Sequence, residues 1–193
     1  KDFFSKSVSR KIKFKFPNIK VATMTNVLAH IDDANSVIQN VKNILHKDGI
    51  FVIEVPYIFD MLQKGLFDLI YHEHLSYFSI SSLNRLFKQN NMRIIDLKKI
   101  NLGASGPALR IIASKNDSKF KDSFNLNKMI HDEKKRGINK LKTYLNFKKK
   151  IITFKSEFKK LVYSIKNEKN KVACFTAPAK GNTLLNYLNF KKG

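Results

Sequence analysis

Cysteine and long apolar runs are scarce in this chain of 193 residues. The single Cys174 excludes a disulfide framework and any cysteine-rich zinc site within these residues. No apolar run approaches the roughly 18 to 20 residues that a helix needs to span a bilayer. Residues 1–4 contain neither Met nor the apolar stretch of a signal peptide. We therefore expect a cytoplasmic protein with no membrane partner, and a segment of a longer one.

Acidic side chains are also few, with 15 Asp and Glu against 37 Lys and Arg and a formal net charge of +22. Such an excess of positive charge suggests a nucleic-acid partner. Residues 115–171, however, hold 18 of the basic residues and six acidic ones. Most lysines in this range lie between the apolar residues of a predicted helix and do not form one compact patch. We expect nucleic-acid binding not to be the main role, and it stays an alternative function.

The first part of the chain predicts a strand, a helix and a second strand. An apolar run at 19–23 reads as a strand that leads into a polar loop. Over 37–45 apolar residues recur at helical spacing after Asp and Asn caps, and basic side chains followed by Gly49 then end the helix. A buried type of strand follows at 50–55, before Pro56. This order is the repeating unit of a parallel α/β sheet.

The next part predicts the edge of the same sheet. A helix is expected over 79–90, with a serine at its start as the cap, and a strand over 92–97. The loop 103–107 is expected to be a simple turn, and 108–114 is a further strand. Adjacent strands joined by a loop suit an antiparallel sheet edge.

The last part of the chain is mainly helical. Apolar residues recur at three- and four-residue steps within 125–167, and we expect this stripe to face the core. A strand over 171–176, a turn at 177–183 and a helix from Leu184 then begin a second α/β unit.

These elements suggest three domains. We expect the distal half of one α/β domain over 1–115, a helical connector over 116–168 and the beginning of a second α/β domain over 169–193.

Four consecutive residues, Tyr71-His72-Glu73-His74, collect two imidazoles, a carboxylate and a phenol. A carboxylate that is hydrogen-bonded to an imidazole fixes its tautomer and makes it a competent base near neutral pH. If the backbone is extended here, His72 and His74 project to one face and Tyr71 and Glu73 to the other. We favour acid–base catalysis. Structural hydrogen bonding stays open, as does a metal-dependent hydrolase that uses His72 and His74 as ligands, although no third ligand is apparent.

Two further segments are candidate binding sites. His30 follows the first predicted strand, at the carboxyl end where open α/β sheets bind ligands, although a lone histidine there can also cap a helix or lie in the core. The turn at 177–183 offers backbone amides at a helix N-terminus together with Lys180 as an anion cradle. A plain turn that needs Gly181 for backbone reasons is the alternative.

Taken together, these segments resemble a known family, the S-adenosylmethionine-dependent sugar C-methyltransferases. The similarity lies in residues 26–30 (NVLAH), 54–57 (EVPY), 67–78 (FDLIYHEHLSYF) and 177–187 (APAKGNTLLNY), in that order. Enzymes of this family methylate a carbon of a nucleotide-linked keto-deoxysugar. The resemblance implies the C-terminal half of a Rossmann-like methyltransferase sheet, a helical connector and the start of a second α/β domain.

The resemblance also implies a mechanism, in which a base removes the proton next to the sugar ketone and the enolate carbon attacks the methyl group on sulfur. It makes His74 the base, Glu73 its adjacent carboxylate and Tyr71 the phenol close to the sugar. His30 is another implied active-site histidine. The implied binding residues are Asn26 and Leu28 for S-adenosylmethionine, and Ser105, Arg110, Lys180, Gly181, Asn182 and Thr183 for the nucleotide-sugar.

The chain departs from the pattern of this family. Family members carry an N-terminal zinc-binding module with clustered cysteines and then a Gly-rich cofactor loop, and these residues, with one cysteine and Gly49 as the first glycine, contain neither. Residues 103–110 read GASGPALR, longer than the Gly-Gly-Ser-Leu-Arg form common in the family, so the sugar specificity is expected to differ. The second α/β unit stops soon after Tyr187. We expect a central fragment that binds S-adenosylmethionine weakly or not at all by itself.

Overall fold

The computed structural model describes residues 2–103, 106–173, 175 and 178–190. The chain divides into two compact units. The first, here called the sheet unit, comprises Lys1–Ile58 and Leu75–Arg136. The second, the helical unit, comprises Phe59–His74 and Gly137–Gly193, so it joins residues that are far apart in the sequence.

The sheet unit is built on four strands in the order β1-β2-β4-β3. Strands β1 (Ile19–Thr25) and β2 (Leu45–Pro56) run parallel and are connected through helix α2 (Ala34–Ile44). Strand β4 (Gly106–Lys115) pairs antiparallel with β2 and with β3 (Met92–Gly103). The mixed α/β sheet with an antiparallel edge, predicted from the sequence, is confirmed.

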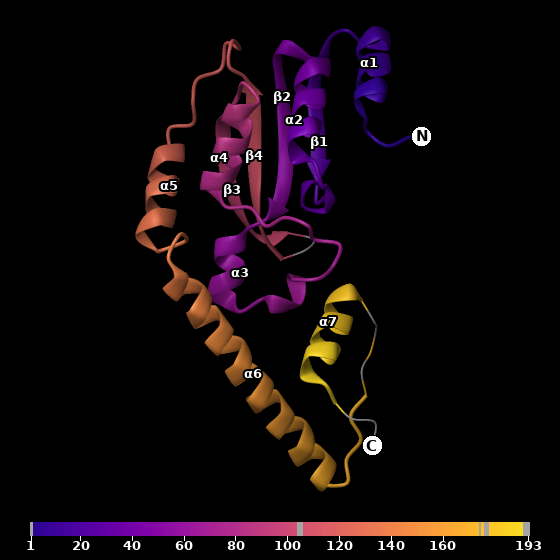
Figure 1. Cartoon of the computed structure of the whole chain (residues 1–193), viewed down its shortest axis with the longest axis vertical. Coiled ribbons are helices and arrows are strands. Elements are labelled where there is room, and N and C mark those ends of the chain that lie inside the picture. The colour runs from indigo at the N-terminus through magenta and orange to yellow at the C-terminus, as the bar shows by residue number, and fades with distance from the viewer. Residues whose placement is uncertain (1, 104–105, 174, 176–177, 191–193) are drawn as a thin grey trace. The chain divides into compact units, whose positions relative to one another are not determined.

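One face of this sheet carries the core. Phe51 and Ile53 of β2 and Ile111 of β4 are fully buried. The ring of Phe51 meets that of Phe87 from helix α4 (Ile80–Gln89) edge-on, with the ring centroids 6.3 Å apart. Figure 1 shows α2 and α4 on the same side of the sheet. Burying each of these large side chains contributes roughly 1.5–3 kcal/mol, so this layer holds the strand ends in place.

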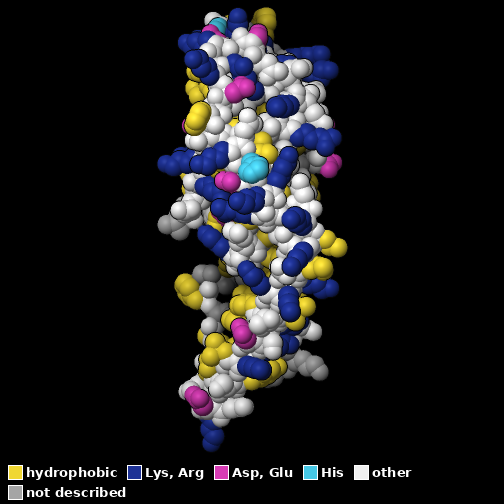
Figure 2. Space-filling model, turned by 90° about the vertical axis from the view of Figure 1, so that its left-hand side faces the viewer, with side chains coloured by type: hydrophobic (Ala, Val, Ile, Leu, Met, Phe, Trp, Pro, Cys, Tyr) yellow, Lys and Arg dark blue, Asp and Glu magenta, His cyan; other side chains and the backbone are white. Residues whose placement is uncertain are grey.

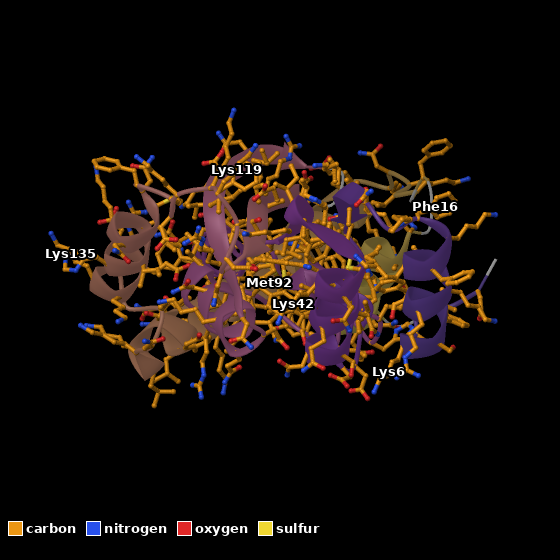
Figure 3. The ribbon with its side chains drawn as sticks, turned by 90° about the horizontal axis from the view of Figure 1, so that it is seen from above. Lys6, Phe16, Lys42, Met92, Lys119 and Lys135 are labelled. Atoms are coloured by element: carbon orange, nitrogen blue, oxygen red, sulfur yellow. The ribbon has the colours of Figure 1, made fainter. Side chains whose placement is uncertain are left out.

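The outer helices of the sheet unit are α1 (Lys6–Lys15), which packs on α2, and α5 (Leu126–Lys135), which packs on α4. Seen from above in Figure 3, Met92 lies at the crowded centre, whereas Lys6 and Lys135 lie at the rim. Met92 is fully buried. Helix α1 was not predicted, because few apolar side chains mark it; the hydroxyl of Ser5 caps it by accepting a hydrogen bond from the backbone of Val8.

The predicted helix end at residues 46–49 is wrong, because α2 ends at Ile44 and these residues belong to β2. Strand β4 reaches the backbone there: the Ser114 hydroxyl donates to the Gly49 carbonyl at 2.8 Å. Gly49 is required by space, since a Cβ at this position would lie 2.9 Å from the Ile19 carbonyl oxygen.

The described part of the helical unit contains four helical elements. They are α3 (Ile58–Lys64, whose first residue belongs to the sheet unit), the 3-10 turn η2 (Phe67–Leu69), α6 (Leu141–Asn167) and α7 (Ala179–Leu188). None of the helices in the described residues is long and apolar enough to cross a bilayer.

Two expectations for this part of the chain are wrong. The apolar stripe of α6 does not face a core, since none of its residues is buried. Within 171–176, the described residues 171–173 and 175 form no strand. A strand needs a neighbouring strand to satisfy its backbone, and the described part of the helical unit contains only helices, turns and loops.

A buried carboxylate joins α5 to the start of α4. Ser79 caps α4, because its hydroxyl accepts a hydrogen bond from the backbone N–H of Ser82 at 3.0 Å. The neighbouring backbone N–H groups of Ile80 and Ser81 donate to the Glu133 carboxylate at 2.7 and 3.0 Å. The Ser81 hydroxyl donates to it as well, at 2.7 Å. Glu133 thus satisfies donors that the helix itself leaves without partners.

We predict that Glu133→Leu lowers the free energy of unfolding by about 2–4 kcal/mol, because two backbone N–H groups lose their acceptor in a buried place. Urea unfolding followed by circular dichroism measures this. Lys134→Leu, on the exposed side of the same helix, is the control and should leave the midpoint nearly unchanged. Equal midpoints for Glu133→Leu and the control would contradict the account.

Candidate active site

The segment before the Tyr71–His74 cluster is a tight turn and not an extended strand. In η2 the backbone N–H of Ile70 donates to the Phe67 carbonyl at 2.9 Å. A second turn follows at once, closed by the N–H of His74 donating to the Tyr71 carbonyl at 3.0 Å. This turn brings the Tyr71 and His74 rings together, with their centroids 4.3 Å apart. The two side chains therefore do not point to opposite faces, as an extended backbone would require.

Both ring nitrogens of His74 have partners from the same short segment. Nδ1 lies 2.8 Å from the Leu69 carbonyl oxygen. Because a carbonyl only accepts hydrogen bonds, Nδ1 carries the proton. Nε2 lies 3.2 Å from the Tyr71 hydroxyl, which donates to its lone pair. His74 is only 7% exposed, and in the neutral ring with the proton on Nδ1 the basic atom is Nε2.

Glu73 is placed differently from the sequence-based expectation. We expected its carboxylate to orient the imidazole of the base, but that place at Nδ1 is taken by the Leu69 carbonyl. The Glu73 carboxylate lies 3.9 Å from Nε2 of His72, in a pair whose side chains are 88% (His72) and 55% (Glu73) exposed. An ion pair this exposed contributes little to stability.

The phenol of Tyr71 is held in its protonated form. Burial raises its pKa above the ordinary value of 10.0, and the negative charge of Glu73 raises that pKa further. The neutral hydroxyl is thus favoured in the folded chain, and this preference is lost only as the pH rises through the raised pKa. Tyr71 is therefore a hydrogen-bond donor throughout the physiological range.

The metal interpretation of this cluster has no support from the geometry. Among the described residues, no three His, Cys, Asp or Glu side chains lie close enough together to hold an ion. The His72 side chain is turned out to solvent, and both ring nitrogens of His74 already have partners.

Other predicted site residues lie in the sheet unit, at the carboxyl ends of the parallel strands. Asn26 follows β1 with a left-handed backbone, at a φ of 55°, and its N–H donates to the Glu54 carbonyl at 2.8 Å. The 3-10 turn η1 (Leu28–His30) comes next, with Leu28 fully buried and His30 exposed. Leu28 can thus offer a cofactor only its backbone.

Arg110 has a partner that the sequence did not reveal. It lies directly opposite Glu54 in the pairing of β2 with β4. Its Nε and Nη2 both donate to Oε2 of Glu54, at 3.1 and 2.9 Å. The carboxylate is almost buried, whereas the Arg110 side chain is 49% exposed and can still present N–H groups to a ligand. Ser105, also expected to bind substrate, lies outside the described residues.

The four remaining predicted residues, 180–183, lie in a helix and not in a turn. Helix α7 begins at Ala179, so the Thr183 hydroxyl donates to the Ala179 carbonyl at 3.1 Å within its first turns. The structure thus places 180–183 in the helical unit with Tyr71 and His74, and Asn26, His30 and Arg110 in the sheet unit.

Positive charge is spread widely over the surface. Figure 2 shows Lys and Arg scattered over one whole face, with acidic and apolar side chains between them. Helix α6 alone carries eight lysines and one acidic residue, Glu157. This face shows no single basic patch. The expectation that nucleic acid is not the main partner stays a prediction.

Comparison with known proteins shows similarity to methyltransferases in both parts of the chain. Residues 4–97 match the methyltransferase domain family, and residues 103–193 match the family of C-methyltransferase C-terminal domains. The curated C-methyltransferase NovU of Streptomyces niveus is 29% identical over 182 residues, which are 94% of this chain and 43% of that protein. The two parts of the chain are thus each similar to a methyltransferase family, and the C-terminal part is similar to C-methyltransferases. The chain spans less than half the length of this relative.

Solved structures show weaker similarity. A methyltransferase from Anabaena variabilis has a TM-score of 0.44 and 12% identity, over 60% of this chain and 56% of that chain. The mitomycin 7-O-methyltransferase MmcR has a TM-score of 0.40 and 14% identity, over 57% of this chain and 39% of that chain. Similarity at this level does not bear on function.

We predict that Glu73→Gln lowers the pKa of Tyr71 toward its ordinary value, because a neighbouring negative charge is removed while burial is retained. The measurement is an NMR titration of the Tyr71 ring carbons, assigned with Tyr71→Phe. Glu157→Gln in α6 removes an equal charge elsewhere and should leave this pKa unchanged. A Tyr71 pKa that is the same in both variants would show that Glu73 does not act on the phenol.

Proposed function

We propose that the full-length protein is an S-adenosylmethionine-dependent C-methyltransferase whose substrate is a nucleotide-linked keto-deoxysugar. The match of residues 103–193 to the family of C-methyltransferase C-terminal domains and the similarity to the C-methyltransferase NovU support the reaction class. The observation that carries the proposal is the pairing of His74 Nε2 with the Tyr71 hydroxyl at 3.2 Å. Methylation of a carbon beside a ketone needs a base and a donor for the developing oxyanion close together, and this pair supplies both.

His74 performs the proton transfer in this proposal. Its Nε2 lone pair takes the proton from the carbon beside the ketone, the C–H electron pair forms a C–C double bond, and the carbonyl pair moves onto oxygen. The Leu69 carbonyl retains the proton on Nδ1 and stabilises the positive charge that the ring acquires. The geometry thus supports a base held in one orientation, with the Nε2 lone pair facing the Tyr71 hydroxyl.

Tyr71 stabilises the enolate. Its hydroxyl donates to Nε2 in this structure, and in the substrate complex it turns to donate to the enolate oxygen, which frees the lone pair of Nε2. The raised pKa of Tyr71 suits this role, since the phenol stays protonated and can donate. S-adenosylmethionine, when bound, supplies the electrophilic methyl group that the enolate carbon takes.

The residues present fit one wall of a site for this cofactor. The parallel strands β1 and β2 end at the same edge, where ligands of open α/β sheets bind. Asn26 leaves β1 in the left-handed conformation, its backbone N–H is bonded to the Glu54 carbonyl, and the residue is partly exposed. A Gly-rich loop is not part of these residues, whose first glycine is Gly49.

We predict that His74→Asn in the full-length protein lowers methyl transfer by roughly 10²-fold or more, the usual contribution of a general base. Solvent exchange of the substrate proton beside the ketone, measured by deuterium incorporation, should fall with it. His72→Asn is the matched control and should retain both, because that side chain points into solvent. Retained exchange in His74→Asn would show that another residue is the base.

A further inference from the structure

Three aromatic rings in the helical unit, Phe67, Phe154 and Tyr187, form a cluster that we call the aromatic junction. The Phe67 ring of η2 lies 4.9 Å from the Tyr187 ring of α7, centroid to centroid. It lies 5.7 Å from the Phe154 ring of α6. Aromatic rings at these separations attract each other through edge-to-face or offset-stacked contacts, in addition to the burial of their apolar surface. Phe67 is therefore held between side chains of two helices, α6 and α7, that begin more than 70 residues after it in the sequence.

Lysine side chains of α6 reinforce this arrangement. Lys155 donates to the Tyr187 carbonyl at 2.6 Å, and its ammonium group lies 4.6 Å from the centroid of the Tyr187 ring. Lys150 donates to the carbonyl of Gln63 in α3 at 2.9 Å. Helix α6 thus forms hydrogen bonds to α7 and to α3, the helix that precedes η2.

The junction is linked to His74 through one short turn. Phe67 and Leu69 are the first and last residues of η2, and the Ile70 N–H closes this turn on the Phe67 carbonyl. The Leu69 carbonyl at the end of the turn accepts the Nδ1 proton of His74 at 2.8 Å. Hydrogen bonds weaken steeply when their angles deviate, so a shift of the Phe67 ring changes the bond that fixes the tautomer of His74.

We propose that Phe67 and Tyr187 are positioning residues for His74, resting on the proposed function in which His74 is the base. The aromatic junction fixes the orientation of η2, η2 fixes the Leu69 carbonyl, and that carbonyl keeps the proton on Nδ1 and the lone pair on Nε2.

The test is ¹⁵N NMR of the His74 imidazole in the 193-residue chain at neutral pH. The wild-type chain should show mainly the Nδ1–H tautomer. Phe67→Ala and Tyr187→Ala should each shift the ratio of the tautomers toward Nε2–H by about fivefold, the effect of losing one ordinary hydrogen bond. Tyr187→Phe keeps the ring and should behave as wild type. Phe67→Leu serves in place of Phe67→Ala if the alanine variant does not fold.

Tyr163→Ala is the matched control, because Tyr163 is an aromatic residue of α6 that packs on Phe190, at 6.3 Å, instead of on Phe67. It should leave the tautomer ratio unchanged. An unchanged ratio in folded Tyr187→Ala and in the Phe67 variant would overturn the proposal, since aromatic packing would then serve stability alone.

Kinetics of the full-length protein separate this proposal from the proposed function. Tyr187→Ala should lower kcat for methyl transfer with a smaller change in KM for the nucleotide-sugar, and Tyr187→Phe should restore it. A tautomer ratio that responds to Tyr187→Ala in a full-length protein without methyl transfer would sink the proposed function and leave the positioning of His74 intact. A normal kcat with a shifted ratio would show that the tautomer does not matter for catalysis.

Discussion

The hydrogen bond from Nδ1 of His74 to the Leu69 carbonyl is the interaction on which the candidate active site depends. A peptide carbonyl cannot donate, so it leaves the imidazole one tautomer, in which Nε2 is basic. A carboxylate in this place could exchange the proton with the ring, whereas the carbonyl cannot. Tyr71 then faces the basic atom with a phenol that burial keeps protonated. One backbone oxygen thus determines what two side chains can do.

This backbone oxygen belongs to a turn that packs with distant helices. Residues 59–74 lie within the match to the methyltransferase domain family, yet they form one compact unit with residues 137–193, which lie within the match to the C-terminal domain family. The segment that carries the candidate base therefore packs with α6 and α7 through Phe67. The two compact units therefore do not coincide with the two family matches along the sequence.

Local patterns were sufficient to predict the strands at β1 and β2 and a serine cap of α4, either Ser79 or Ser81, because strand patterns and capping depend on near neighbours. Contacts that do not depend on the type of residue could not be predicted from the sequence. The Leu69 carbonyl as a partner of His74 is such a case, since any residue has a carbonyl. The pairing of Glu54 with Arg110 required the strand register, and the helix over 180–183 required knowing where α7 begins.

The most direct test of the account is the hydrogen bond itself, measured as a scalar coupling across it between Nδ1 of His74 and the carbonyl carbon of Leu69 in the ¹⁵N,¹³C-labelled chain. The account predicts a detectable coupling, with the proton on Nδ1 and an unprotonated Nε2 at neutral pH. A proton on Nε2 together with no coupling to Leu69 would contradict it.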